Sequence, residues 1–361
     1  MPAALRGNAL FVASGATLHL LCLSDPSSPS IAQALVLPSP ILRMITVEEG
    51  IVALLADKRV VLVEETANGF AIQAETSCNK RPVSLGVYHH SAGKIALLFA
   101  DKVGEVWATD LPSMRRRVFL GGHCASVITD MAVSPCGSFV ATCDRDEKIR
   151  LSSLPAFDTV RYCLGHVDVV TSVSFVPGEQ SRQLLCSVGW DFSLLMWDCS
   201  CGRLLDRMSF DASSSRHRQQ GGDGDEALLG DRVYDEDEAG SFPFKVIAFS
   251  GSQEEVFATI LFRGESVVQI VRIMSDSEGV RFSGATSIQL PSVPSEVIPL
   301  APGVISFLTG KPSYLSCHTI ESRDGEIVCA EHTERFEVAV NQFRAYCVTH
   351  GTLLPLLYNV L

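Results

Sequence analysis

The 361-residue chain lacks the short motifs that mark most cofactor-dependent and metal-dependent enzymes. It has no glycine-rich loop placed between a strand and a helix, and no H-E-x-x-H segment. Gly310 and Lys311 are followed by Pro312, whereas a phosphate-binding loop requires Ser or Thr at that point. We therefore predict no catalytic residues, no cofactor and no metal site in this chain.

Paired cysteines are also missing, although the chain contains 12 cysteines. None has the C-x-x-C spacing that holds zinc, and the closest two, Cys199 and Cys201, are separated by a single residue. No secretory signal peptide is recognisable. These observations predict reduced thiols, packed as small apolar side chains in the cytosol or nucleus, with a secreted disulfide-bonded protein as the alternative.

The apolar runs of the chain are short. Its apolar start, residues 9–23, is interrupted by polar residues and alternates like two strands joined at Ser14-Gly15. A signal peptide needs a continuous apolar run of about 7–15 residues, and a membrane helix needs about 20. The sequence predicts a soluble protein with no membrane contact.

Basic residues are scarce relative to acidic ones: 29 Lys and Arg face 41 Asp and Glu, for a formal net charge of −12. This balance argues against a broad nucleic-acid surface, because phosphate contacts require clustered cations. Half of the net charge lies in residues 211–240, where nine acids face three arginines. That segment is predicted to be a disordered acidic insertion, or alternatively a segment that docks on a partner.

Although catalytic motifs are absent, the sequence contains a repeated unit. Gly122-His123 and Gly165-His166 lie 43 residues apart, and each pair is followed by an alternating strand and a turn. Four-stranded propeller blades have periods of about 40–45 residues and a Gly-His signature. The second unit has a strand, a turn and a strand that ends in Trp197-Asp198, as in a WD repeat. These features predict an all-β propeller.

Alternating apolar residues mark further units along the chain. They fall at residues 8–37, 41–75, 82–121, 123–160, 166–210, 243–290 and 293–330. We predict one domain over residues 1–361, a seven-bladed WD40-type β-propeller, with six or eight blades as alternatives. The acidic insertion 211–240 would lie between blades, and residues 331–361 would form a closing strand or a C-terminal tail. Closure is expected to pair a strand from one terminus with strands from the other.

Four polar residues of the fuller unit are predicted to be structural. His166, Ser187, Asp191 and Trp197 occupy the positions of the hydrogen-bonded set that ties a WD blade together. A Ser-His-Asp triad could be drawn from three of them, but no Gly-x-Ser-x-Gly turn presents the serine. The preceding unit has His123, Thr142 and Asp146 but Ser152 in place of the tryptophan, so its set is predicted to be incomplete.

One stretch carries a family resemblance. The run from Asp144 to Ser152, Asp-Arg-Asp-Glu-Lys-Ile-Arg-Leu-Ser, is followed by Cys163-Leu164-Gly165-His166 and Val169-Val170-Thr171-Ser172. It closely resembles the WD-repeat, non-catalytic subunit of the tRNA (guanine-N7) methyltransferase. Phe99-Ala100-Asp101-Lys102 with Gly104 is similar to the preceding blade of that family. The specific part of the resemblance covers about residues 94–200.

The resemblance implies a scaffold that forms a heterodimer with a separate, catalytic methyltransferase subunit. That partner is expected to bind S-adenosylmethionine and to methylate a guanine in the tRNA variable loop. The propeller would hold it in a competent arrangement, contact tRNA mainly through it, and work in the nucleus, with the cytoplasm as a second location. A generic WD interaction platform, such as a ubiquitin-ligase adaptor or a chromatin scaffold, is the alternative.

The same resemblance implies that the charged turn binds the partner. Its candidate residues are Arg145, Asp146, Glu147, Lys148, Arg150 and, one blade earlier, Lys102. Because strand side chains alternate, Ile149 and Leu151 should face one side and Lys148, Arg150 and Ser152 the other. Arg150 is expected to form an ion pair with the partner; the alternative is that it pairs with Asp144, Glu147 or a neighbouring blade.

Three consecutive arginines form the one basic cluster visible in the sequence. Arg115, Arg116 and Arg117 precede Gly121-Gly122-His123 and are candidates for contact with RNA phosphates. No aromatic residues are interleaved with them to stack on bases. We favour a solvated loop at this position.

Overall fold

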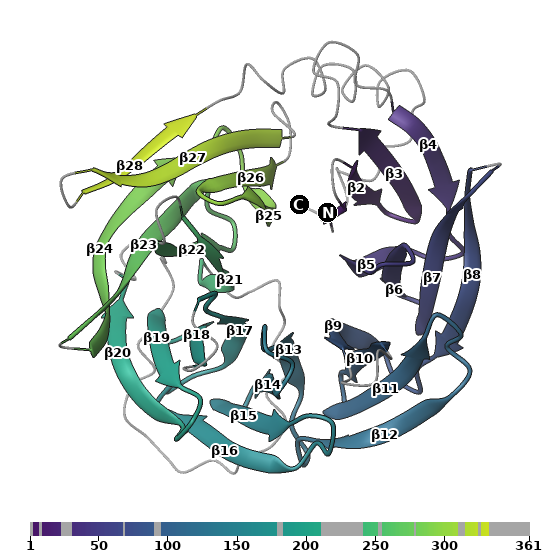
Figure 1. The fold of residues 1–361 in the computed structure, drawn as a ribbon, viewed down its shortest axis with the longest axis horizontal. Helices are drawn as coiled ribbons and strands as arrows, with labels where there is room; N and C mark the ends of the chain where they lie inside the picture. Colours follow the sequence, from purple (N-terminus) through teal and green to yellow (C-terminus); the bar gives the residue numbers. More distant parts are fainter. Residues whose placement is uncertain are drawn as a thin grey trace, which may run out of the picture.

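The computed structural model describes residues 3–6, 9–22, 31–67, 69–89, 95–178, 183–210, 241–251, 255–277, 279–309, 315–323 and 326–331. Every regular element in these ranges is a β-strand, and the strands form seven antiparallel sheets of four. The sheets stand around a central axis as the blades of a propeller (Figure 1). The predicted all-β, seven-bladed WD40-type fold is confirmed.

Each blade consists of four strands that are consecutive in the sequence. Blades 1 to 3 are formed by β1 (Ala3–Arg6), β2 (Ala9–Ser14), β3 (Thr17–Cys22) and β4 (Ile31–Val36); β5 (Ile41–Thr46), β6 (Ile51–Leu55), β7 (Arg59–Thr66) and β8 (Gly69–Ser77); and β9 (Pro82–His89), β10 (Ile95–Asp101), β11 (Glu105–Leu111) and β12 (Arg117–Gly122). Blades 4 and 5 are formed by β13 (Ile128–Val133), β14 (Phe139–Asp144), β15 (Lys148–Ser153) and β16 (Thr159–Leu164), and by β17 (Val170–Phe175), β18 (Leu184–Gly189), β19 (Ser193–Asp198) and β20 (Arg203–Ser209). Blades 6 and 7 are formed by β21 (Pro243–Ser250), β22 (Val256–Phe262), β23 (Val267–Asp276) and β24 (Gly279–Gln289), and by β25 (Pro294–Ala301), β26 (Val304–Thr309), β27 (Leu315–Arg323) and β28 (Glu326–Glu331).

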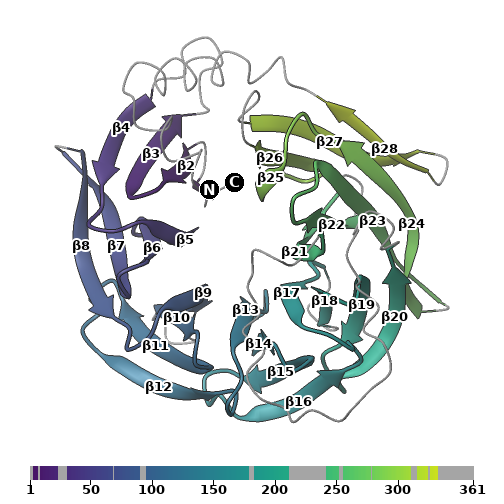
Figure 2. The ribbon, with the colours of Figure 1, turned by 180° about the vertical axis from the view of Figure 1, so that it is seen from behind.

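The ring closes differently from the expectation. The first strand of each blade lies innermost and the fourth lies on the circumference, which both views along the axis show (Figures 1 and 2). Strand β1 lies beside both β5 and β25, so the innermost strands form a complete circle. Residues 3–6, which were not recognised as a strand, give blade 1 its own inner strand, so its four-stranded sheet contains no strand from the other terminus.

Two predicted features fall outside the described residues. These are the acidic insertion at 211–240 and, beyond Glu331, the closing strand or tail at 331–361. The flanking strands β20 and β21 belong to consecutive blades, so the segment between them joins blade 5 to blade 6.

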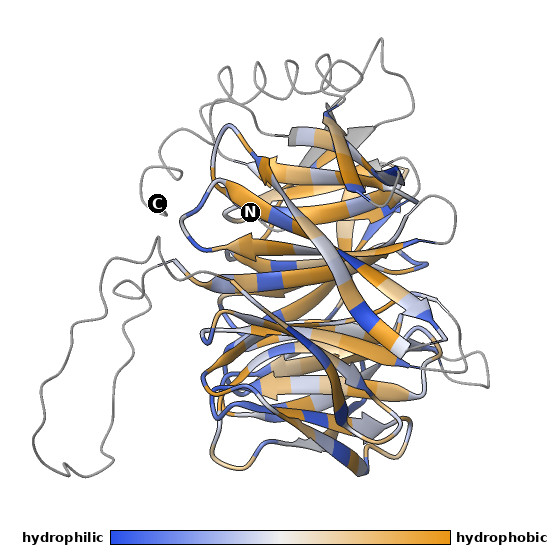
Figure 3. Ribbon diagram, turned by 90° about the vertical axis from the view of Figure 1, so that its left-hand side faces the viewer, coloured by the Kyte–Doolittle hydropathy of each residue, from blue (hydrophilic) through white to orange (hydrophobic). Residues whose placement is uncertain are grey.

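The hydrophobic core lies between successive blades. In blade 4, Ile149 and Leu151 are fully buried and pack with Trp197 and Leu185 of blade 5. Equivalent apolar clusters lie at the other interfaces, for example between Leu54 of blade 2 and Phe99 of blade 3. Hydrophobic residues dominate the strands, whereas hydrophilic residues gather at their ends (Figure 3). Burial of apolar area stabilises such packing by about 25 cal/mol per Å².

The antiparallel topology gives the ring two different faces. One face carries the turns between the second and third strands of each blade, together with the connections from one blade to the next. We call it the turn face. The opposite face carries the other two hairpins of each blade.

The turn face has a regular pattern of backbone hydrogen bonds. In blades 2 to 6 the first residue of the turn donates its N–H to the connection that precedes the blade. The donors and acceptors are Ala56 and Pro40 at 2.9 Å, Lys102 and Arg81 at 3.0 Å, Arg145 and Val127 at 3.1 Å, Trp190 and Val169 at 2.9 Å, and Arg263 and Phe242 at 2.9 Å. Each turn is therefore held at a fixed place on this face.

Ten of the cysteines in the described ranges form no disulfide, and six of these ten are buried. Burial raises the pKa of Cys78, Cys163 and Cys186 to about 12, so these thiols stay protonated and unreactive. No helix in the described ranges is long and apolar enough to span a bilayer.

Candidate functional site

Blade 5 contains the four predicted structural residues in mutual contact. Nε2 of His166 lies 2.8 Å from Oγ of Ser187, and Nδ1 lies 2.9 Å from Asp191. The indole N–H of Trp197 donates to the same serine oxygen at 2.8 Å. The side chains of His166 and Asp191 are 0% and 3% exposed. The order of bonds resembles a catalytic triad, but the serine is buried and already accepts from Trp197, so the set ties the blade together.

Blade 4 has a related hydrogen-bonded set, but its carboxylate comes from a different aspartate than the sequence predicts. Nε2 of His123 lies 2.7 Å from Oγ1 of Thr142, as the sequence predicts. Its Nδ1, however, lies 2.7 Å from Asp144, whereas Asp146 was the predicted partner. Assigning Asp146 to this set was wrong.

The correction has a clear physical reason. Asp144 occupies the position of Gly189 in blade 5, where no side chain is available and the carboxylate must come from two residues later. Oδ1 of Asp144 also accepts the N–H groups of Asp146 and Lys148, both at 3.0 Å. Burial would raise the pKa of Asp144, but the hydrogen bonds from His123 and the Lys148 amide hold it below its usual value. One carboxylate thus fixes both the histidine and the turn.

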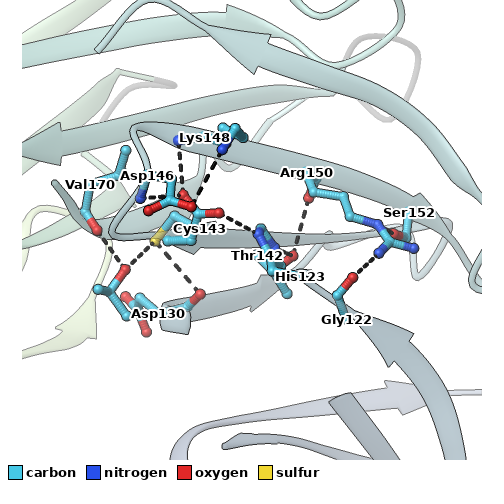
Figure 4. A network of polar contacts seen from close by, with 12 residues as sticks. Gly122, His123, Asp130, Thr142, Cys143, Asp146, Lys148, Arg150, Ser152 and Val170 are labelled. Atoms are coloured by element: carbon cyan, nitrogen blue, oxygen red, sulfur yellow. Dashed lines mark hydrogen bonds and ion pairs between the residues drawn. The ribbon is translucent and has the colours of Figure 1, made fainter. Parts of the chain in front are cut away.

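The missing tryptophan of blade 4 is replaced by three residues. The guanidinium of Arg150 donates from Nη1 to the carbonyl of Gly122 and from Nε to Oγ of Ser152 at 3.1 Å (Figure 4). It also lies 5.4 Å above the ring of Phe157, which is almost completely buried. Gly122 belongs to β12 of blade 3, so Arg150 joins two blades. The sequence left open whether Arg150 contacts a partner protein, a nearby acidic residue or a neighbouring blade. In the structure it contacts a neighbouring blade.

The turn that follows Asp144 presents its charges to solvent. Asp146 and Lys148 form an ion pair at 3.5 Å with side chains that are 51% and 47% exposed. Glu147 is exposed and makes no hydrogen bond or ion pair within the described residues. Its φ of 66° lies in the left-handed region, which the fixed geometry of the turn imposes. The charged turn is therefore a rigid projection on the turn face.

Lys102 lies on the equivalent turn of blade 3. Asp101 caps this turn as Asp144 caps its own, accepting the N–H of Val103 at 3.0 Å and of Glu105 at 3.1 Å. The N–H of His123 donates to the carbonyl of Gly104 at 2.9 Å, so both turns contact the connection between blades 3 and 4. The structure thus places Lys102 and residues 145–148 on one face, while the side chain of Arg150 is directed at β12 of blade 3. Partner binding by these residues stays a prediction.

The three consecutive arginines lie on the opposite face, where Arg115 and Arg116 join β11 to β12 and Arg117 is the first residue of β12. Arg117 donates to the carbonyl of Ser77 and, at 3.3 Å, to Oδ1 of Asn79, and its guanidinium lies 4.4 Å above the ring of Trp107. Arg115 and Arg116 are exposed. The arginines therefore do not adjoin the predicted partner-binding turns.

Sequence reasoning missed Asp130, a buried carboxylate on the inner strand of blade 4. It accepts hydrogen bonds from Ser84 of blade 3 at 3.0 Å and Ser172 of blade 5 at 2.8 Å. Arg43 of blade 2 lies 3.6 Å away. Burial would raise the pKa of Asp130, but Lys245, Arg43 and Ser172 hold it below its usual value. The only signal in the sequence was a charged residue within an inner strand.

Within the described ranges, no three His, Cys, Asp or Glu side chains are grouped so that they could hold a metal ion.

Two solved structures that are similar to this chain share its fold at low sequence identity. Hsv2 of Kluyvelomyces marxianus aligns over 79% of this chain and 83% of its own, with a TM-score of 0.54 and 14% identity. A chain of the Mitotic Checkpoint Complex aligns over 85% of this chain and 83% of its own, with a TM-score of 0.60 and 14% identity. These similarities concern the propeller alone.

Sequence relatives are more specific. The chain is similar to proteins named tRNA (guanine-N(7)-)-methyltransferase non-catalytic subunit, with 39% identity over 117 residues for WDR4 of Homo sapiens, 38% over 92 residues for wdr4 of Dictyostelium discoideum and 34% over 143 residues for wuho of Drosophila willistoni. The aligned segments cover 32%, 25% and 38% of this chain, and 27%, 19% and 33% of those relatives.

A sequence model of the tRNA methyltransferase TRM82 WD40 domain matches residues 112–298, just over half of the chain. The matched segment includes blade 4 with its charged turn, blade 5 and blade 6. The chain belongs to the family of the tRNA methyltransferase TRM82 WD40 domain.

Proposed function

We propose that this chain is the non-catalytic subunit of a tRNA guanine-N7-methyltransferase, and that it binds and stabilises the catalytic subunit through its turn face. The names of its relatives support the first part of this proposal. The observation that carries the second part is the charged turn at 145–148, in which residues 146–148 are exposed while the backbone is held rigidly by Asp144 and by the contacts of Arg150.

In this proposal the two subunits divide the work. The catalytic subunit binds S-adenosylmethionine and carries out methyl transfer in the variable loop of tRNA, in a heterodimer located in the nucleus. The propeller supplies a preorganised surface. Because the turn is already ordered before binding, little conformational entropy is lost when the partner docks. Charges at the rim of such an interface mainly set specificity and the rate of association.

The direct test is a pull-down of the tagged full-length chain, with bound proteins identified by mass spectrometry and N7-methylguanosine measured in tRNA after deletion. We expect recovery of a methyltransferase and loss of the modification. Persistence of the modification in the deletion strain would refute the proposed function.

The role of the turn is tested by Glu147→Lys, which reverses an exposed charge that has no internal partner among the described residues. Lys58 occupies the equivalent turn position of blade 2 with a φ of 73°, so the backbone accepts lysine there. We expect loss of the partner without a change in thermal unfolding. The matched control is Glu326→Lys, which reverses an exposed charge on the opposite face of blade 7. If both variants retain the partner equally, the turn is not the interface.

A further inference from the structure

The innermost strands carry a set of polar side chains at equivalent positions around the propeller axis. In blades 2 to 7 the pairing between the first and second strands skips one residue near the start of the first strand. Such irregularities re-aim the side chains beside them. The first residue after the skip is polar in all six blades. We call these residues the polar belt: Arg43, Ser84, Asp130, Ser172, Lys245 and Glu296.

Asp130 of blade 4 joins this belt to both neighbouring blades. Its carboxylate accepts hydrogen bonds from Ser84 of blade 3 at 3.0 Å and from Ser172 of blade 5 at 2.8 Å. It also accepts the N–H of Val173 at 3.4 Å, and Arg43 of blade 2 lies 3.6 Å away. Among the described belt residues, Asp130 alone has side-chain hydrogen bonds to the blades on both sides. Blades 2 to 5 therefore meet at one carboxylate.

This carboxylate is closed off from solvent. Asp130, Ser84 and Ser172 are 3%, 2% and 0% exposed. Burial would raise the pKa of Asp130, but Lys245, Arg43 and Ser172 hold it below its usual value, so the group is charged at neutral pH. Loss of one partner from a buried charge is costly, and a fully satisfied polar network is rigid. The belt thus fixes blade 4 between its neighbours.

The segment around Asp130 also contacts the base of the charged turn. The carbonyl of Asp130 accepts the thiol of Cys143 at 3.6 Å (Figure 4). Oγ1 of Thr129 lies 3.2 Å from the same sulfur and donates to the carbonyl of Val170 in blade 5. Cys143 is fully buried and directly precedes Asp144, whose carboxylate accepts two N–H groups of the turn. The paired strands β13 and β14 therefore connect the belt to the exposed turn.

Blade 5 has part of this arrangement. Thr171 takes the place of Thr129 and donates to the carbonyl of Pro243 in blade 6 at 2.7 Å. The belt residue that follows it is Ser172, which carries no charge. The link made by the threonine is therefore shared by blades 4 and 5. The charged anchor with bonds on both sides belongs to blade 4, beneath the turn proposed to bind the methyltransferase.

We propose that Asp130 is a positioning residue for the charged turn, and that it raises the affinity for the catalytic subunit from inside the ring without touching that subunit. This step rests on the proposed function. With its serine donors in place, Asp130 holds blade 4 in one orientation relative to blades 3 and 5, so the turn is presented in one position. Without the carboxylate, blade 4 shifts against its neighbours, and part of the binding free energy is used to order the turn again.

The test compares the full-length wild-type chain with Asp130→Ala and with the conservative variant Asp130→Asn. Hydrogen exchange of the Asp146 and Lys148 amides is measured on the chain alone. The dissociation constant for the methyltransferase recovered in the pull-down is measured next, well below the unfolding temperature. The control is Ile305→Ala or Ile305→Val, whichever lowers the melting temperature as much as Asp130→Ala does. Ile305 is fully buried in blade 7, across the ring from blade 4 (Figure 1).

We expect Asp130→Ala to speed exchange of both amides and to weaken methyltransferase binding, each by about 10-fold, a size typical of coupling between sites. Asp130→Asn retains part of the hydrogen bonding and should lie between Asp130→Ala and wild type. The Ile305 control should change neither measurement. If Asp130→Ala does not fold, S84A/S172A removes the two hydroxyl donors, keeps the carboxylate and should give a smaller change in the same direction.

Three outcomes overturn the proposal. Unchanged exchange at the turn means that Asp130 stabilises the ring without positioning the turn. Faster exchange with unchanged affinity means that the position of the turn does not set binding. An equal loss of affinity in the Ile305 control assigns the effect to global stability. Failure of the wild-type chain to bind the methyltransferase refutes the proposed function instead, and the exchange data on the chain alone keep the two failures apart.

Discussion

Blades 4 and 5 each hold the histidine of the connection that precedes them, but they do so with different side chains. In blade 5 the buried indole of Trp197 completes a hydrogen-bonded set within a single blade. In blade 4 that place is taken by Arg150, Ser152 and Phe157, and the guanidinium reaches the carbonyl of Gly122 in blade 3. Blade 4 therefore compensates for the missing tryptophan. A hydrogen bond between blades 3 and 4 replaces the hydrogen bond that the indole makes within blade 5.

This difference changes how a functional residue is recognised. A conspicuous arginine beside an exposed charged turn suggests an ion pair with a partner. In the structure the guanidinium of Arg150 is directed at Gly122 of blade 3, and the exposed charges are those of residues 146–148. We therefore predict that Arg150 positions the candidate interface, a role distinct from those of Trp197 and of the turn itself.

The largest effect is expected for Trp197→Ala. The indole is fully buried between blades 4 and 5 and is the donor to Ser187, so truncation leaves a cavity and an unused polar atom. Comparable substitutions cost about 3–5 kcal/mol. Urea unfolding should show this loss. A value near that of a surface substitution would mean that the set contributes little to the stability of blade 5.

A smaller loss is expected for Arg150→Leu. The change leaves the carbonyl of Gly122 without its donor and removes the bond to Ser152, at a cost of about 1–3 kcal/mol. Partner affinity should fall as well, because the strand that leaves the turn loses its anchor. Arg150→Lys can restore only one of the two donor directions, so partial recovery of both readouts is expected. Full stability with lost partner binding would instead indicate direct contact by Arg150.

Acid should destabilise both blades through their carboxylates. Burial would raise the pKa values of Asp144 and Asp191, but hydrogen bonds and charge attraction from His123 and His166, together with backbone N–H groups, lower both in the folded chain. The stabilisation is complete above the unfolded pKa of about 3.9 and is lost as the pH falls through the lowered folded values. Urea midpoints measured down to about pH 3 should therefore fall, and Asp144→Asn should flatten part of that decrease. An unchanged pH profile in the variant would contradict the role of Asp144.

The smallest change in stability is expected for Glu147→Gly. Gly104 has a φ of 90° at the equivalent position of blade 3, so glycine suits this turn. Relief of the left-handed strain opposes the entropy gained by the unfolded chain, and stability should change by less than about 1 kcal/mol. Calorimetry on the variant, combined with a partner-binding assay, separates the carboxylate from the fold. Retained binding would show that Glu147 is dispensable.

The sequence predicts the architecture well because strand alternation and the 43-residue period are local signals. It misses the strand at residues 3–6, a short segment with no repeat motif of its own. Spacing alone assigns the blade 5 set correctly but misassigns Asp146 in blade 4, because Asp144 reaches the histidine from the last position of its strand, where blade 5 has glycine.

The repeated bond between each turn and the connection before it has an evolutionary consequence. The side chains of a turn can change in evolution while its backbone hydrogen bond is kept. Binding specificity then depends on side-chain atoms, whereas folding depends on backbone atoms. The turns of blades 2 to 6 are therefore equivalent attachment points, and grafting residues 145–147 onto the turn of blade 2 would move the proposed recognition epitope around the ring without redesigning a single strand.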